Sequence, residues 1–188
     1  MTYFLGAEWL SADDGDTVKW NTTSSATSLI HSMRLSVPQA FQEDQGIAKD
    51  STLYLATSKE SPGLTWQTNW ARALHQQFNN NGSLTNTQDT ASRPINANQP
   101  ALATSVNLGS IEQVSPSVFW AIGLVRQPTI RFQTLRENVP QHYHSFFWTK
   151  YTSIDEAIDD FIQDFPNALT RSVALDRKVM EDAGKVSS

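Results

Sequence analysis

The residues best suited to chemistry lie in one polar loop, residues 84–93, which reads LTNTQDTASR. Asp89 and Arg93 are spaced to form an ion pair that fixes the loop, while Asn86 and Gln88 offer the donors and acceptors that a polar ligand needs. The alternative is that the loop satisfies its own backbone, because N–H and C=O groups in a folded loop must find partners. The sequence favours this second interpretation. It leaves these four residues as candidate ligand-binding residues.

Arg126 is the fifth candidate ligand-binding residue. It ends the most continuous apolar run in the chain, residues 118–125, and is followed by Gln127 and Pro128. Its guanidinium has two interpretations, an internal salt bridge or a contact with a bound anion. The sequence alone does not choose between them.

Two clusters consist of residue types that bind metal ions in other proteins. Asp13, Asp14 and Asp16 stand close together, but they lack the alternating oxygen ligands, glycine and glutamate of an EF-hand loop and are typical of a turn. His142 and His144 are two residues apart, which on a strand turns both rings to one side, yet a site needs a third ligand. We therefore predict no metal site, and we find no catalytic residue or cofactor motif.

Composition restricts the class of protein. The chain has 188 residues, a net charge of −5 and 18% charged residues, and much of its polarity comes from Ser, Thr, Asn and Gln. No basic face for nucleic acid and no basic amphipathic helix for a membrane surface is visible. There are no cysteines, so stability comes from packing without disulfides. The sequons at Asn21 and Asn81 indicate glycosylation and, with the composition, an extracellular location.

Short alternating apolar runs predict β-strands along most of the chain. Residues 3–9 and 18–20 are expected to form a hairpin around the Asp-rich turn. Further strands are expected at residues 28–37, 52–57, from 64, 101–108 and 118–125, the last two as buried strands. His31 falls among apolar positions and is interpreted as a hydrogen-bonded core residue. The six tryptophans are assigned mainly to the core, although aromatic rings also form sugar-binding platforms.

Helical patterns dominate the end of the chain. Ser153 and Glu156 have the spacing of a capping box, and the apolar residues that follow recur at helical spacing. The acidic residues of this helix are interpreted as its solvated face: Asp155, Asp159, Asp160 and Asp164. Pro166 is expected to begin a second helix. Residues 70–78 fit either a helix or a strand.

Several segments resemble the fungal secreted glutaminase A family. They read TLYLATS, LTWQ, GSLTNTQDT, VFWAIGLVRQPTIRF and EAIDDFIQDFPNALTRSVALDRKV, in one collinear order that spans nearly the whole chain. The resemblance implies a β-sandwich domain that lies N-terminal to a helical, glycosidase-like (α/α) barrel. Asn107 and Gln127 stand where the family pattern has acidic residues, so this chain does not carry any role of those carboxylates.

The expected architecture is mainly β: an antiparallel β-sandwich portion followed by a C-terminal helical linker, α+β overall. We assign residues 1–135 to a sandwich that lacks its first strands and residues 136–188 to the linker towards a missing barrel. The chain is thus expected to be a fragment whose partner is the rest of its parent, either in one polypeptide or as a nicked heterodimer.

Two functions are predicted. The first is a non-catalytic, secreted support for the barrel of a protein that, by the resemblance, hydrolyses L-glutamine to glutamate and ammonia. The second is an extracellular glycoprotein module that recognises carbohydrate or a host receptor through the loop and exposed tryptophans.

Overall fold

The computed structural model describes residues 1–95, 99–111, 118–134 and 139–186. Within these ranges the fold is mainly antiparallel β-sheet with two α-helices. The strands are β1 (Thr2–Gly6), β2 (Thr17–Ser24), β3 (Ser28–Leu35), β4 (Glu43–Asp44), β5 (Ile47–Ala48), β6 (Thr52–Ser58), β7 (Thr65–Trp70), β8 (Arg93–Pro94), β9 (Pro100–Ser105), β10 (Ala121–Val125), β11 (Ile130–Phe132) and β12 (Gln141–Tyr143). The helices are α1 (Ala71–Asn81) and α2 (Ile154–Val186), with 3-10 turns at Ala7–Trp9 and Phe146–Thr149.

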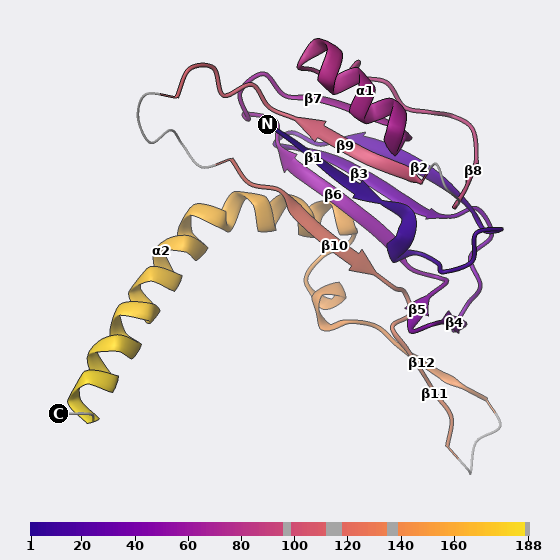
Figure 1. The fold of residues 1–188 in the computed structure, drawn as a ribbon. Helices are drawn as coiled ribbons and strands as arrows, with labels where there is room; N and C mark the ends of the chain where they lie inside the picture. Colours follow the sequence, from indigo (N-terminus) through magenta and orange to yellow (C-terminus); the bar gives the residue numbers. More distant parts are fainter. Residues whose placement is uncertain (96–98, 112–117, 135–138, 187–188) are drawn as a thin grey trace.

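Two sheets pack face to face (Figure 1). One has five strands in the order β10-β6-β3-β2-β8, and the other has three in the order β1-β9-β7. Alternate residues of each strand turn inward, so Leu53 and Leu55 of β6 meet Leu5 of β1 and Leu102 of β9 in one buried cluster. The predicted mainly β architecture is therefore confirmed.

Each sheet is covered on its outer face by a helix (Figure 1). Leu74 of α1 packs with Ala103 on the three-stranded sheet, and Ile162 of α2 packs with Ile30 and Ala56 on the five-stranded sheet. The layers run α1, small sheet, large sheet, α2. Residues 70–78, which the sequence left open, belong largely to α1, which ends at Gly82 in the left-handed conformation (φ 66°) that glycine adopts freely.

The predicted hairpin between residues 3–9 and 18–20 is wrong. β1 pairs with β9, placing Leu5 opposite Leu102, whereas β2 pairs with β3, placing Trp20 opposite Met33. The intervening turn instead carries the chain from one sheet to the other. Apolar alternation identifies a strand but not its partner, because both segments need only a buried face.

β10 is the edge strand of its sheet and not a buried strand as predicted. The strand covers only part of the apolar run, and Ile122 is 50% exposed and Leu124 47% exposed. The other predicted buried strand is confirmed, since all six residues of β9 are buried between β1 and β7. β9 is more buried than β10 because it is the central strand of the three-stranded sheet and is covered by α1, whereas β10 lies at the edge of its sheet.

Pro166 does not begin a second helix, because α2 continues through it. Proline inside a helix removes one N–H donor and bends the axis, and Figure 1 shows α2 bending as it leaves the sheet. Every described residue from Pro166 to Val186 is exposed, so the bend meets no packed neighbour. Among the described residues, no helix is both long and apolar enough to cross a bilayer.

The start of α2 has the predicted N-cap. The Ser153 hydroxyl accepts a hydrogen bond from the Glu156 N–H at 3.1 Å. The Glu156 carboxylate reaches one residue further back than in a standard capping box and accepts from the N–H and hydroxyl of Thr152, each at 2.9 Å. These bonds lower the pKa of the Glu156 carboxyl.

Candidate functional site

The predicted polar loop runs beside β7. Asn86 behaves like a strand partner of Trp66: its N–H donates to the Trp66 carbonyl at 2.7 Å, and its side-chain oxygen accepts from the Trp66 N–H at 2.9 Å. Asn86 has a positive φ of 57°, a conformation that asparagine tolerates better than most residues. Its side chain therefore replaces a missing backbone partner.

Asp89 fixes the middle of the loop. Its N–H donates to the Thr68 hydroxyl at 2.9 Å, and its carbonyl accepts from the Trp20 indole. Its carboxylate accepts from the Ala91 N–H at 3.0 Å and from the Arg93 guanidinium at 2.6 Å. Burial opposes ionisation of the Asp89 carboxyl, but the bonds from Arg93 and Ala91 outweigh it and lower its pKa. The predicted ion pair is confirmed.

Arg93 also lies over the face of Trp70, with its guanidinium carbon 5.0 Å from the ring centroid. Gln88 lies half-buried in the same loop. The polar groups of Asn86, Asp89 and Arg93 are thus engaged with the loop and its strand. Their use as ligand-binding residues stays a prediction, and the structure favours their use in holding the loop.

Arg126 belongs to a different cluster. Its guanidinium binds Asp50 through Nε at 2.6 Å and Glu43 through Nη1 at 3.2 Å, and it lies 4.8 Å from the centroid of the Phe41 ring. The ring of His142 also stacks on the ring of Phe41, with centroids 5.4 Å apart. Of its two interpretations, the internal salt bridge is the one that the structure shows.

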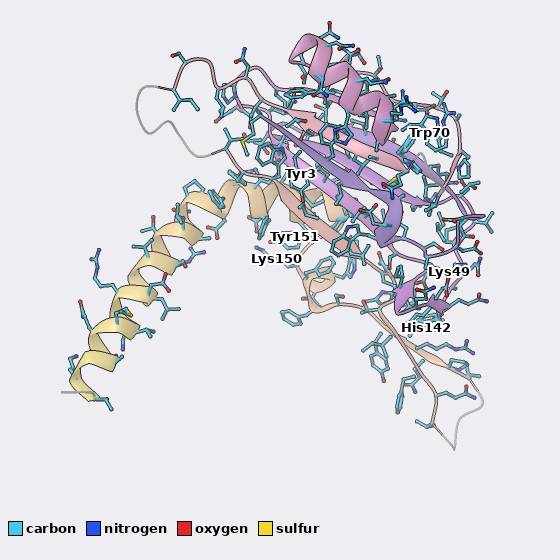
Figure 2. All side chains as sticks on the ribbon, viewed as in Figure 1. Tyr3, Lys49, Trp70, His142, Lys150 and Tyr151 are labelled. Carbon is cyan, nitrogen blue, oxygen red and sulfur yellow. The ribbon has the colours of Figure 1, made fainter. Side chains whose placement is uncertain are left out.

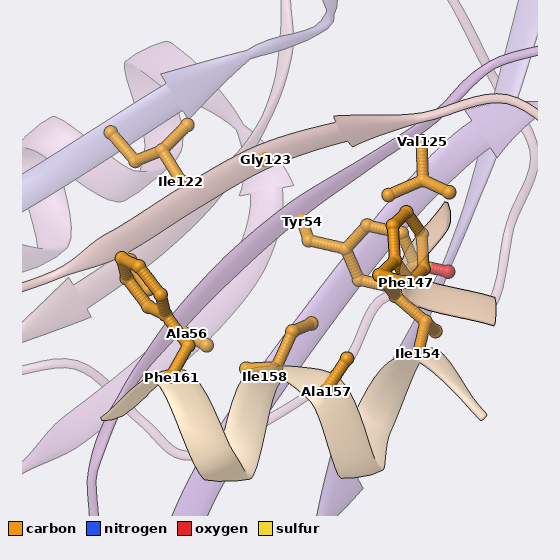
Figure 3. A pocket seen from close by; sticks show the side chains of 11 residues that line it. Tyr54, Ala56, Ile122, Gly123, Val125, Phe147, Ile154, Ala157, Ile158 and Phe161 are labelled. Carbon is orange, nitrogen blue, oxygen red and sulfur yellow. The ribbon is translucent and has the colours of Figure 1, made fainter. Parts of the chain in front are cut away.

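Two neighbouring pockets lie on the outer face of the five-stranded sheet, and the polar one is lined by Phe41 and Asp50 of this cluster. The apolar pocket, of about 230 Å³, lies between α2 and the strands β6 and β10 (Figure 3). The polar pocket, of about 370 Å³, includes Arg34, Asp50 and the aromatic ring of Trp148. Tyr54 and Val125 line both pockets, so the two share a wall.

Sequence reasoning missed Arg34, Asp50 and Tyr54. Arg34 lies on β3, Tyr54 lies on β6 and Asp50 lies two residues before β6, and only the pairing of β3 with β6 brings them together. The alternation of the strands could have indicated two of these residues. Arg34 and Tyr54 both lie on the strand face opposite the apolar core positions, so their side chains do not serve the core between the sheets.

Other predicted residues are placed as follows. His31 is confirmed as a core residue, fully buried, with Nδ1 3.0 Å from the Thr22 hydroxyl. Asp155 and Asp159 are not simply solvated, because they accept hydrogen bonds from Thr23 at 2.9 Å and Ser25 at 2.7 Å, respectively, and join α2 to the sheet.

The remaining predicted residues lie on the surface. Both sequon residues, Asn21 on β2 and Asn81 at the end of α1, are exposed. His142 and His144 are exposed too, and no group of three or more metal-binding side chains occurs in the described part of the chain. The tryptophans are divided, since Trp20 is buried and Trp9 is 56% exposed. Figure 2 shows the side chains, with His142 labelled on β12.

The fold and these clusters define a β-sandwich module with a projecting helix. Residues 4–182 match the profile of the family described as "Domain of unknown function (DUF5127)", and the chain belongs to that family. It is also 27% identical over 184 residues to the protein named Glutaminase A from Aspergillus oryzae, an alignment that covers 95% of this chain and 26% of the relative. The chain thus spans about a quarter of that relative's length. No solved structure matches it.

Proposed function

We propose that this chain is a non-catalytic β-sandwich module of a secreted, glutaminase A-like protein and that it supports the catalytic barrel of that protein. The match to Glutaminase A along nearly the whole chain supports the choice of parent protein. The parent activity would be hydrolysis of the side-chain amide of L-glutamine to glutamate and ammonia. The partner of the module is then the remainder of the longer polypeptide.

The observation that carries this proposal is the second half of α2. The helix face that packs on the sheet through Ile158 and Ile162 continues past Phe165 as an exposed apolar stripe. We call this the α2 stripe; it consists of Leu169, Val173, Val179 and Met180, which are 49%, 50%, 56% and 74% exposed. An apolar stripe of this length on a projecting helix is typical of a surface that packs against another protein segment.

A supporting role agrees with how the polar residues are used. In the candidate loop, the Asp89 carboxylate and the Arg93 guanidinium form an ion pair with each other. The Arg126 guanidinium forms ion pairs with Asp50 and Glu43. Catalytic acids and bases need instead to face a substrate with their reactive atoms. Secretion and glycosylation at the exposed Asn21 and Asn81 complete the proposal; the intact mass of the native protein tests both sequons.

Two experiments test this function. The purified chain, incubated with L-glutamine, is expected to release no ammonia above a protein-free blank. Sustained ammonia release that follows the chain's concentration would refute the non-catalytic role. In the full-length parent protein, the double substitution Leu169→Asp and Val173→Asp is expected to reduce stability and glutaminase activity. Ala174→Asp, on the opposite face of the helix, is the matched control and is expected to preserve both; equal effects would contradict packing through the α2 stripe.

A further inference from the structure

The apolar pocket is already open in the folded chain. Ala121 and Gly123 of β10 form one wall and Ala157, Ile158 and Phe161 of α2 form the other (Figure 3). A Cβ added at Gly123 would meet no atom within 4 Å. The absence of a side chain at this position therefore leaves open space on β10. Apolar cavities of about 150 Å³ stay dry and bind small hydrocarbons. At about 230 Å³ this pocket has room for a short alkyl chain or one aromatic ring.

The adjoining polar pocket is lined by Asp50 and by the cationic side chain of Arg34. The Asp50 carboxylate forms an ion pair with Arg126, with Oδ1 2.6 Å from Nε, and it accepts a hydrogen bond from the Phe41 N–H at 2.7 Å, so its charge is already paired. Arg34 is exposed and lines this pocket, and its guanidinium forms no ion pair or hydrogen bond with the residues that the structure describes. An unpaired guanidinium at the rim of a pocket favours an anionic group, above all a carboxylate that it can bind through two parallel hydrogen bonds.

Tyr54 connects the two pockets. Its ring lies along the apolar pocket, and its hydroxyl points towards the end formed by Val125 and Phe147 (Figure 3). Burial, followed by the charge of Asp155, raises the pKa of the Tyr54 hydroxyl above its ordinary value. The hydroxyl therefore keeps its proton at neutral pH, and its hydrogen-bond partner is the Thr52 side chain, which also lines the polar pocket. The apolar pocket thus adjoins a polar pocket that is lined by the Tyr54 hydroxyl and by Arg34.

We propose that the two adjoining pockets together form a binding site for an amphiphilic organic carboxylate. Its alkyl or aryl part occupies the apolar pocket between β10 and α2, and its carboxylate lies at the Arg34 guanidinium beside Tyr54. A neutral hydrocarbon would leave Arg34 unused, and an inorganic anion would leave the apolar pocket empty. Only a ligand with both parts uses both pockets.

Octanoate, below its micelle concentration, is the probe. Titration followed by calorimetry and by amide NMR shifts is expected to show saturable one-to-one binding. Hexanoate lacks two methylenes, each worth about 0.8 kcal/mol when buried, so its affinity is expected to be roughly tenfold lower. Acetate, which has the charge alone, and 1-octanol, which has the chain alone, are expected to bind at least roughly tenfold more weakly than octanoate.

Substitutions locate the site. Arg34→Gln removes an exposed charge without touching the core and is expected to weaken octanoate binding at least roughly tenfold, with no effect on 1-octanol. Arg72→Gln makes the same charge change on α1 and is the matched control. The valine side chain in Gly123→Val would occupy part of the apolar pocket, so this variant is expected to bind both octanoate and 1-octanol more weakly.

Three results would overturn the proposal. The first is the lack of saturable octanoate binding. The second is equal affinity for octanoate and 1-octanol. The third is equal loss of octanoate binding in the Arg34 and Arg72 variants, which would indicate non-specific charge attraction.

Discussion

The ring of Phe119 stacks on the ring of Phe165, with centroids 3.9 Å apart and planes 18° from parallel. Phe119 lies just before β10, and Phe165 is the last residue of α2 before the exposed half of the helix. The stack therefore joins the edge of the five-stranded sheet to the point where α2 leaves it. Aromatic pairs in this geometry contribute about 0.5–1.5 kcal/mol beyond their buried area. The first half of α2 is part of the folded body, and the second half is not.

This division predicts different costs for similar substitutions along α2. Ile162 is 4% exposed, so Ile162→Ala is expected to lower the free energy of unfolding by about 2–4 kcal/mol through lost burial and the cavity left behind. Val173→Ala, on the exposed half, is expected to change it by less than about 0.5 kcal/mol. Chemical denaturation of both variants measures the difference; equal effects would mean that α2 does not pack as described.

The Trp120 indole donates a hydrogen bond to the Thr104 hydroxyl at 2.7 Å and so joins the two sheets. Thr104→Val leaves this donor without its partner and is expected to destabilise the protein by about 1–2 kcal/mol. Trp120→Phe is expected to cost about 1–3 kcal/mol, because it also changes the stack with Tyr3. The double variant is expected to lose less than the sum of the two. Strict additivity in the unfolding free energies would argue against the bond.

His31 predicts a dependence of stability on pH. Burial lowers the pKa of its imidazole from 6.5 to about 4 in the folded chain. Between these values the unfolded state binds a proton that the folded state does not, so stability rises with pH. The contribution is complete above pH 6.5, is lost as pH falls towards 4, and amounts to about 3 kcal/mol.

Unfolding measured from pH 4 to pH 7 checks this dependence. His31→Leu removes the titrating group and is expected to flatten the slope, whatever its effect on stability at pH 7. His144→Gln, at an exposed histidine, is the control and is expected to keep the slope of the unsubstituted chain. A slope that survives in the His31 variant would assign the pH dependence to other groups.

Sequence reasoning was most successful where the physics is local. The Ser153 cap, the Asp89–Arg93 ion pair and the buried position of His31 each depend on residues close in the chain or on one alternating pattern. Strand partners and pockets depend on contacts distant in sequence, which explains the wrong hairpin and the missed position of Arg34 beside β6. The continuous α2 was missed because the sequence pattern assigns Pro166 to the start of a second helix, whereas a helix can continue through proline with one fewer N–H donor and a bent axis.

The polar loop predicts a local loss of order when its ion pair is removed. Asp89→Ala frees the Arg93 guanidinium and the Ala91 N–H, and we expect a loss of about 1–2 kcal/mol in unfolding free energy and faster proteolysis within residues 84–93. Asp89→Asn keeps an acceptor oxygen for Ala91 and is expected to have a smaller effect. Unchanged proteolysis in the alanine variant would show that the other hydrogen bonds of the loop, including those to Trp66, Thr68 and Trp20, hold it without the carboxylate.

The space at Gly123 predicts a stabilising substitution. Glycine weakens a strand because its backbone loses more conformational entropy on folding and because it has no side chain to pack, whereas valine favours the extended conformation. Because a Cβ at this position meets nothing within 4 Å, Gly123→Val is expected to raise the free energy of unfolding by about 1 kcal/mol while it fills part of the apolar pocket.

Gly109 provides the matched control for Gly123. A Cβ added at Gly109 would also meet no atom within 4 Å. The φ of Gly109 is +59°, however, a conformation that costs a β-branched residue about 1–2 kcal/mol. Gly109→Val is therefore expected to destabilise the chain. Opposite signs for the two variants in thermal or chemical unfolding would separate backbone conformation from available space, and a loss of stability at Gly123 would show that β10 and α2 lie closer than this geometry allows.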